Sequence, residues 1–226
     1  MPLCRMRPGQ IASLMLALLL LAGCASSAGR ALLPAQGGQA GKDLVVFLGD
    51  SLTAGYGVAP QDAYPAVIGH YWQSHDIGFR ALNAGISGNK TTDVLARLDP
   101  LLTADVCLVF LEIGANDAFA GDDIDAIHAR ISEIIRRIQA RGIPMALAAL
   151  ELPAGHPQVG LERAARYRRM YEELAREHAV PVMPFFRSVG RQDLWLPDSL
   201  HLNAEGNRLI ARDVLAFLNP AWKLEP

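Results

Sequence analysis

The chain has 226 residues, of which 51% are hydrophobic and 19% charged, so it can bury a core, which excludes wholesale disorder. Its 21 Lys and Arg residues against 23 Asp and Glu residues give a net charge of −2, which excludes a basic nucleic-acid-binding domain as the default function. Three cysteines are too few for a disulfide-stapled scaffold.

The first 23 residues have the pattern of a secretory signal peptide. Arg5 and Arg7 precede an almost wholly apolar run at residues 11–22, which is shorter than the roughly 20 residues of a membrane-spanning helix. The sequence LAGC at residues 21–24 then resembles the bacterial lipobox, in which the cysteine is acylated and the chain is cut before it. The alternative is an ordinary secretory peptide that is cut nearby, with Cys24 incidental.

Lipidation at Cys24 predicts a periplasmic protein that is anchored to a bacterial membrane, because two or three acyl chains give stable attachment. Ser26 stands where Asp would favour the inner membrane, so we expect the outer membrane. Residues 24–42 are rich in Gly and Ser without an apolar period, which predicts a flexible tether. The folded domain is then expected over residues 43–226.

From residue 43 on, strand-like and helix-like segments alternate. Apolar runs of strand length predict five buried strands, at residues 44–48, 79–83, 106–111, 144–150 and 180–183. Apolar residues that recur every three or four positions predict helices at residues 63–73, 91–98, 123–141, 161–178 and 204–218. This alternation predicts a single doubly wound α/β/α domain of three layers with a mainly parallel five-stranded sheet.

Ligands bind beyond the carboxyl ends of parallel strands, so the segments that follow the first three strands are the candidates for a site. Residues 49–57 follow the first strand and include Ser51, although Asp50 and Ser51 could merely cap a short helix. Residues 83–89 follow the second strand and could be a plain glycine turn.

The remaining candidates lie farther along the chain. Residues 112–117 follow the third strand and end in Asn116 and Asp117, residue types that often begin turns or helices. Asp198 and His201 precede the last helix, where they could form a helix-entry turn. Each segment alone is ambiguous. Together they supply a nucleophile, a small-residue turn, an amide donor and an Asp–His pair, which are the parts that acyl transfer needs.

These four blocks resemble the motifs of the SGNH, or GDSL, hydrolase family. The resemblance covers residues 44–218 and is closest to the bacterial branch of thioesterases, lysophospholipases and arylesterases. It implies an SGNH, flavodoxin-like fold and a catalytic triad of Ser51, His201 and Asp198. Ala115 stands where a glycine is common in the family, which is a conservative change that leaves the implied chemistry intact.

The resemblance also implies an oxyanion hole formed by the backbone N–H groups of Ser51 and Gly88 and by the side-chain amide of Asn116. His201 would take the proton of the serine as it attacks an ester or thioester carbonyl, and an acyl-enzyme intermediate would follow. Asp198 would hold the imidazole in the correct tautomer. We assign Asp50 and Asp117, by contrast, to hydrogen bonding within turns and loops.

We expect no cofactor and no metal, because the six histidines lack ligand spacing with carboxylates or cysteines. Cys107 stands alone in an apolar run and predicts a buried, inert thiol. The expected partner is a small acyl or aryl ester, for which the loops at residues 118–121 and 152–157 could line a groove. We expect a monomer that binds no nucleic acid. Two alternatives are a cell-wall carbohydrate O-acetyl esterase and a non-catalytic binding lipoprotein.

Overall fold

The computed structural model describes residues 31–38, 41–152 and 159–222. The expected signal peptide at residues 1–23 and the expected lipidation site at Cys24 therefore lie outside the described residues. Within the described ranges, no helix combines the length and the apolar character needed to cross a membrane.

A single sheet of five parallel strands, in the order β2-β1-β3-β4-β5, forms the centre of the domain. The strands are β1 (Leu44–Gly49), β2 (Arg80–Gly85), β3 (Val106–Glu112), β4 (Met145–Ala149) and β5 (Val182–Pro184). The strand order reverses direction between β1 and β3, and in doubly wound sheets this switch point is where ligands bind. The predicted α/β fold with a five-stranded parallel sheet is confirmed.

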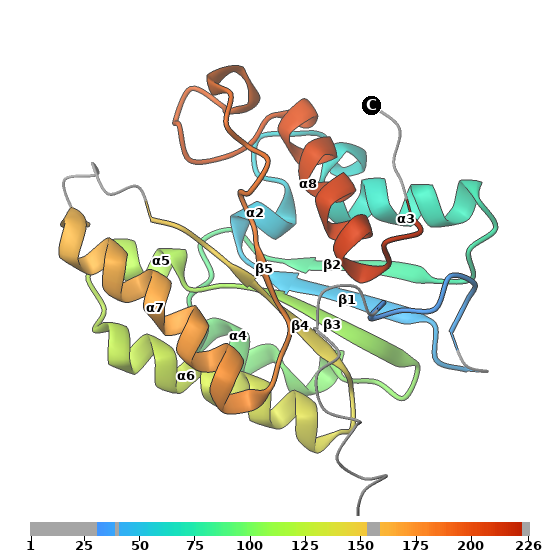
Figure 1. Ribbon diagram of the computed structural model, residues 1–226, viewed down its shortest axis with the longest axis horizontal. Helices are drawn as coiled ribbons and strands as arrows, with labels where there is room; N and C mark the ends of the chain where they lie inside the picture. Colours follow the sequence, from blue (N-terminus) through green and yellow to red (C-terminus); the bar gives the residue numbers. More distant parts are fainter. Residues whose placement is uncertain (1–30, 39–40, 153–158, 223–226) are drawn as a thin grey trace, which may run out of the picture. The chain divides into compact units, whose positions relative to one another are not determined.

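Helices cover both faces of the sheet. One face carries α2 (Ser51–Ala54), α3 (Tyr64–Ser74) and α8 (Ala204–Leu218), as Figure 1 shows. The other carries α4 (Thr91–Arg97), α5 (Ala115–Phe119), α6 (Ile124–Ala140) and α7 (Gly160–His178). Among the described residues, 3₁₀ turns occur at Pro60–Asp62, Asp99–Leu101 and Gln192–Leu194.

Helix α6 illustrates how the sequence pattern becomes packing. Asp123 caps its first turn by accepting from the Ala126 backbone N–H at 3.3 Å. Its buried stripe consists of Ile124, Ile127, Ile131, Ile134, Ile135 and Ile138. Burying a side chain of this size stabilises the fold by roughly 1.5–3 kcal/mol. This stripe therefore fixes which face of α6 lies on the sheet.

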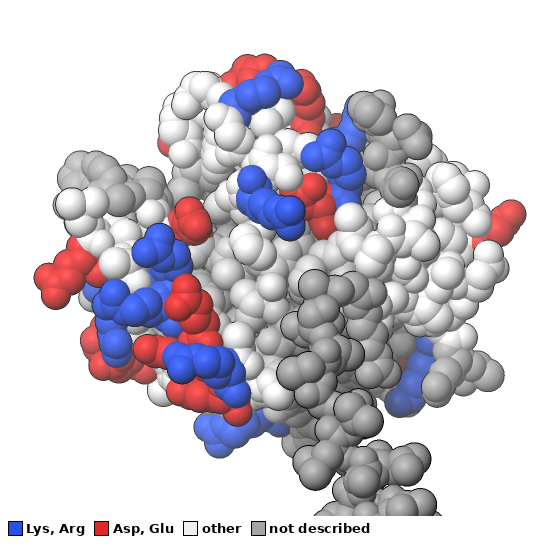
Figure 2. Space-filling model, in the orientation of Figure 1, with Lys and Arg blue, Asp and Glu red and all other residues white. Residues whose placement is uncertain are grey.

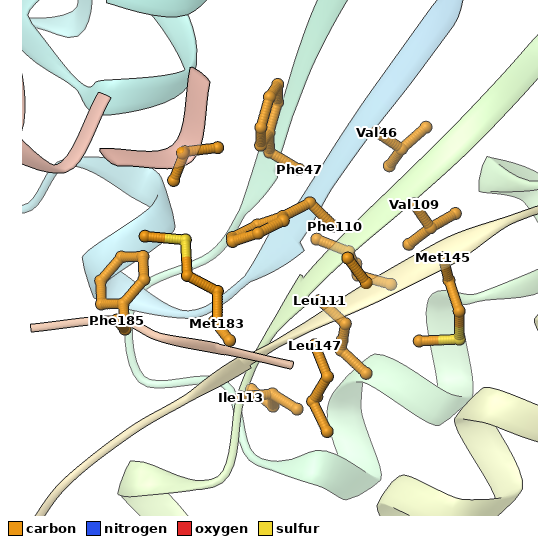
Figure 3. Close-up of a cluster of buried hydrophobic side chains, with 14 of the residues drawn as sticks. Val46, Phe47, Val109, Phe110, Leu111, Ile113, Met145, Leu147, Met183 and Phe185 are labelled. Atoms are coloured by element: carbon orange, nitrogen blue, oxygen red, sulfur yellow. The ribbon is translucent and has the colours of Figure 1, made fainter. Parts of the chain in front are cut away.

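The core lies between the sheet and both helical layers. Side chains from β1, β3, β4 and the segment around β5 interdigitate there, as Figure 3 shows for Val46, Phe47, Phe110, Leu147 and Met183. All five are buried. Because both faces of the central strands are covered, their sequences are continuous apolar runs rather than alternating ones.

The folded unit begins at Ala31, which is earlier than the residue 43 that the sequence suggests. Leu33 is buried, and its backbone N–H donates to the Leu218 carbonyl oxygen at 3.1 Å. The Asn219 side chain donates back to the Leu33 carbonyl oxygen at 2.8 Å. The prediction of a flexible tether is thus wrong around Leu33. The sequence pattern missed this contact because two leucines are too few to show a helical or strand periodicity.

The Cys107 thiol is half-buried rather than fully buried as expected. It donates to the Leu44 carbonyl oxygen at 3.3 Å, and burial raises its pKa to about 11. A thiol with so high a pKa is mostly protonated at neutral pH, which agrees with the expected low reactivity.

The outer surface of α7 carries basic and acidic side chains in alternation, as Figure 2 shows. Arg166 pairs with Asp125 at the start of α6. Exposed pairs of this kind contribute at most about 1 kcal/mol each. This surface therefore consists of a solvated helix face.

Candidate active site

Three strand ends meet at the switch point of the sheet. Gly49, at the end of β1, is in register with Gly85 of β2 and Glu112 of β3. A side chain on Gly49 would begin 2.1 Å from Thr53 Oγ1, and one on Gly85 would begin 2.2 Å from the Ala54 nitrogen. Only glycine permits this close approach, so α2 lies directly on the strand ends, as Figure 1 shows for β1.

Ser51 is the first residue of α2 and is 9% exposed. Asp50 caps this short helix, because its side chain accepts from the Leu52 backbone N–H at 3.0 Å. The Ser51 Oγ atom lies 2.8 Å from Nε2 of His201, which is 150 residues away in the sequence. The structure therefore joins the first and the last predicted blocks.

The turn from Asp198 to His201 holds the imidazole in place. One carboxylate oxygen of Asp198 accepts from the backbone N–H groups of Leu200 and His201, both at 2.9 Å. The other oxygen lies 2.8 Å from His201 Nδ1. Ser199 has a φ of 55°, which the tight turn imposes on a non-glycine residue.

The charge of Asp198 assigns the imidazole tautomer. Burial opposes ionisation, but hydrogen bonds from the His201 backbone and imidazole and from the Leu200 backbone lower the pKa of Asp198 to about 2. An ionised carboxylate only accepts hydrogen bonds, so Nδ1 carries the proton. Nε2 is then the acceptor for the Ser51 hydroxyl, which is the orientation of a general base.

A pocket opens beside Ser51 and His201. It is lined in addition by Leu52, Gly55, Tyr56, Tyr64, Phe185, Leu202, Asn207 and Ile210. The Tyr56 ring, which is 52% exposed, lies 4.5 Å from the His201 ring, centroid to centroid. The imidazole is therefore covered on one face by an aromatic side chain and borders a small pocket with both polar and apolar lining residues.

Asn116 in α5 lies close to the first block. Its Nδ2 atom donates to Asp50 Oδ2 at 3.2 Å and to the Asn89 carbonyl oxygen at 3.0 Å. Gly88 lies in the exposed turn that follows β2 and has a φ of 83°, a conformation that favours glycine. The second and third predicted blocks thus meet at the residue that precedes Ser51.

A pair of carboxyl groups lies beneath this site. Asp50 is 1% exposed and Glu112 is 0% exposed. Glu112 Oε2 accepts from Thr53 Oγ1 at 2.8 Å, and Thr53 Oγ1 also contacts the Tyr64 hydroxyl at 3.1 Å. Burial raises the pKa of Asp50 to about 6, and burial together with the Asp50 charge raises that of Glu112 further above its usual range.

Asp117, next to Asn116, has a different environment. Its carboxylate accepts from the Thr91 backbone at 2.9 Å and from the Thr91 hydroxyl at 2.5 Å. It also pairs with Arg130 of α6 at 3.1 Å. These contacts join α4, α5 and α6, so Asp117 has a structural hydrogen-bonding role, but between helices rather than within a turn or loop as expected from the sequence.

Sequence reasoning missed two residues of the site. Glu112 was not singled out. The available signal was its position as a single carboxylate at the end of an apolar strand, next to the switch point of the sheet. Tyr56 was seen only as part of a turn. Of the two loops predicted to line a groove, residues 118–121 form the end of α5 and the turn after it, and residues 152–157 lie outside the described residues except for Leu152. The described residues contain no cluster of three or more His, Cys, Asp or Glu that could hold a metal ion.

Known proteins resemble this chain over most of its length. A thioesterase 1/protease 1/lysophospholipase L1 of Escherichia coli K12 is 32% identical over 184 residues, which cover 80% of this chain and 86% of that protein. An arylesterase of Vibrio mimicus is 32% identical over 181 residues, which cover 78% of this chain and 88% of that protein.

A solved structure supports the fold. The esterase EstA of Pseudoalteromonas superposes with a TM-score of 0.73 at 24% identity, over 78% of this chain and 97% of that one. The model of the GDSL-like lipase/acylhydrolase family matches residues 47–209, a span that includes all four sequence blocks. The protein is therefore a member of the GDSL-like lipase/acylhydrolase family.

Proposed function

We propose that this protein hydrolyses acyl esters or thioesters through an acyl-enzyme, with Ser51 as nucleophile, His201 as general base and Asp198 as its orienting partner. The observation that carries the proposal is the chain of two 2.8 Å contacts from Ser51 Oγ to His201 Nε2 and from Nδ1 to Asp198. A serine hydroxyl is a weak nucleophile without such a base.

The proposed reaction has two halves. In the first, His201 Nε2 takes the Ser51 proton while Oγ forms a bond to the carbonyl carbon, and the imidazolium then returns the proton to the leaving alcohol or thiol. In the second, water gives a proton to His201 and attacks the acyl carbon. The imidazolium then returns that proton to Ser51 Oγ as the bond from Oγ to the acyl carbon breaks, which releases the acid and regenerates the serine. Asp198 stays ionised and stabilises the imidazolium.

The proposed oxyanion hole consists of the backbone N–H groups of Ser51 and Gly88 and the side-chain amide of Asn116. Each donor acts on the negative charge that develops on the carbonyl oxygen in the transition state. The loss of one such donor costs about 2.7–4 kcal/mol of barrier in comparable sites. Asn116 is suited to this role because its hydrogen bonds fix the position of its amide.

The pocket surroundings favour an apolar acyl or aryl group as part of the substrate. Tyr56, whose ring lies against His201, and Ile86, whose backbone N–H donates to the Gly49 carbonyl oxygen, are both about half exposed and offer apolar surface near Ser51. The names of the two relatives, which act as a thioesterase or lysophospholipase and as an arylesterase, support the same class.

A fluorophosphonate probe tests the mechanism, because it reacts with an activated serine. We expect the chain without residues 1–24 to be labelled and the Ser51→Ala variant to remain unlabelled. Hydrolysis of p-nitrophenyl esters from acetate to palmitate, and of acyl thioesters, then defines the preferred chain length. Activity on acetate alone, with release of acetate from cell-wall sugars, would instead indicate a carbohydrate O-acetyl esterase.

We also propose that the mature protein is a monomer anchored by lipid at Cys24 to the outer membrane, facing the periplasm. The sequence of residues 1–26 supports this location. Metabolic labelling with an alkyne fatty acid should tag the wild-type chain but not Cys24→Ala, and membrane fractionation should find only the former in the outer membrane. Light scattering of the lipid-free form measures the oligomeric state.

A further inference from the structure

The Asn116 amide has two N–H bonds, and both are engaged. One points to Asp50 Oδ2 at 3.2 Å and the other to the Asn89 carbonyl oxygen at 3.0 Å. An amide nitrogen offers no third hydrogen, so an oxyanion gains a donor from Asn116 only if one of these two acceptors gives way. The two acceptors differ strongly, and the difference indicates which one yields.

The Asn89 carbonyl belongs to a turn whose preceding residues, 86–88, are exposed. A neutral carbonyl oxygen is the weaker acceptor, and this one belongs to the residue that follows Gly88, another of the proposed oxyanion donors. An oxyanion is a charged acceptor and forms hydrogen bonds roughly twice as strong as neutral ones. The Asn89 carbonyl is therefore the acceptor that a transition state displaces.

The Asp50 carboxylate, by contrast, is fixed and charged. Asp50 is buried at the end of β1, and its other oxygen is held by the Leu52 backbone N–H. Its own backbone nitrogen lies 3.5 Å from Glu112 Oε2, which ties it to the end of β3. A charged, immobile acceptor retains its hydrogen bond when the neighbouring one is exchanged.

The titratable groups that face Asp50 are Glu112 from β3, Asp117 from α5 and His201 from the turn before α8. Burial raises the pKa of Asp50 to about 6, and burial together with the Asp50 charge raises the pKa of Glu112 well above its usual value. Two buried carboxyl groups do not both ionise readily, and Asp50 is the one whose two oxygens both accept hydrogen bonds, from the Leu52 N–H and from Asn116, so Asp50 carries the charge of the pair.

We propose that Asp50 is a positioning residue for the oxyanion hole: it holds one N–H of Asn116 throughout the reaction, so that the other passes from the Asn89 carbonyl to the oxyanion. Glu112 is the neutral partner that keeps Asp50 in place. This inference rests on the proposed function, since it assigns Asn116 to the transition state. Asp50 itself touches no reacting atom in this scheme.

The Asp50→Ser variant separates positioning from helix capping. A serine hydroxyl is also a good N-cap and retains the bond from the Leu52 N–H, but it leaves Asn116 without its charged acceptor. We expect kcat for p-nitrophenyl ester hydrolysis to fall about 10- to 100-fold, the equivalent of a lost charge-assisted hydrogen bond, while KM changes less than threefold.

A matched control is Asp123→Ser, the same substitution at the N-cap of α6, away from the site. It should leave kcat unchanged. The decisive measurement is a double-mutant cycle with Asn116→Ala, because a residue that acts through Asn116 has no further effect once the amide is gone. In the Asn116→Ala background, Asp50→Ser should change kcat less than threefold.

Losses that multiply in the double variant, or an unchanged kcat in Asp50→Ser, would overturn the inference. Should Asp50→Ser not fold, Asp50→Asn serves in the same cycle, because its single amide oxygen cannot serve both Leu52 and Asn116. Ser51→Ala is measured alongside. If it stays active, the proposed function fails; if it is inactive while Asp50→Ser is not, only the present inference fails.

Discussion

Two aspartates support the site, Asp50 next to Ser51 in the chain and Asp198 against the His201 ring, and the protein holds them in opposite ways. Asp50 is 1% exposed and is fixed by the ends of β1 and β3, whereas the Asp198 side chain is 40% exposed and is held by the backbone of its own turn. Burial raises the pKa of Asp50 to about 6; for Asp198 burial is outweighed by three hydrogen bonds, which lower its pKa to about 2. Environment rather than residue type therefore sets the role of each carboxylate.

The Asp198 turn and the Asp50 segment should respond differently to substitutions. The Asp198 turn depends on contacts within four residues, so its geometry survives as long as its own hydrogen bonds do. The Asp50 side depends on strand register over segments that are 62 residues apart in sequence. Substitutions on the two sides should thus differ in both size and pH dependence.

The largest expected effect comes from removing the proposed nucleophile or its general base. Ser51→Ala and His201→Ala should each lower kcat by at least about 10⁴-fold. The first removes the nucleophilic hydroxyl, and the second removes the base that activates it. Steady-state hydrolysis of a p-nitrophenyl ester measures this loss. Near-wild-type thermal unfolding of both variants is the control, and turnover retained in Ser51→Ala would contradict the mechanism.

Asp198→Asn tests whether the Asp198 carboxylate sets the tautomer of His201. The Asn oxygen still accepts from the Leu200 and His201 backbones, so the turn persists, but its NH₂ group faces Nδ1 and favours the tautomer with the proton on Nε2. That tautomer cannot accept the Ser51 proton, so kcat should fall about 10³- to 10⁴-fold. NMR of the imidazole nitrogens should report the exchanged tautomer; an unchanged tautomer with full activity would contradict this assignment.

Asn116→Ala tests the buried side. We expect a loss of about 10²- to 10³-fold in kcat with little change in KM, because the amide acts on charge that develops only in the transition state. A raised KM with unchanged kcat would instead place Asn116 in substrate positioning. Kinetics on two esters with different leaving groups separate these outcomes.

The pH dependence of stability distinguishes the two aspartates. The folded state binds a proton at Asp50 more tightly than the unfolded chain does, because its pKa rises from 3.8 to about 6. The stability contributed by this group is therefore lost as pH rises from about 4 to 6, by up to about 3 kcal/mol.

Asp50→Asn removes that penalty. Its Tm relative to wild type should become more positive from pH 4.5 to pH 8, as measured by differential scanning calorimetry. Asp198 behaves in the opposite sense: its pKa is lowered, so its contribution is present above about pH 4 and declines only as the pH falls toward 2. A Tm difference for Asp50→Asn that does not vary with pH would show that Asp50 is not buried as a charge.

The smallest expected effect concerns the remote contact between the two ends of the domain. Asn219→Ala removes the bond to the Leu33 carbonyl and leaves a buried acceptor unpaired, which should cost about 1–3 kcal/mol of unfolding free energy. Urea unfolding measures this change. Because the contact lies away from both aspartates, kcat should stay at the wild-type value, and a lowered kcat would reveal an unexpected coupling.

The sequence by itself determined the fold class and singled out the residues that are proposed here to carry the chemistry. Continuous apolar runs and the isoleucine stripe of α6 encode buried strands and an amphipathic helix locally, and they appear in the structure within a few residues of the predicted bounds. Ser51, Asn116, Asp198 and His201 stood out because each follows a strand or precedes a helix, where parallel topology gathers polar groups.

Only the tertiary structure decided the environments of these groups. The start of the domain at Ala31, the half-burial of Cys107 and the proximity of Glu112 to Asp50 all depend on contacts between distant segments. Hydrophobic periodicity is a local property, whereas the desolvation of a carboxyl group depends on everything packed around it. For this reason the sequence could assign different roles to Asp50 and Asp198, but the opposite shifts of their pKa values became visible only in the folded chain.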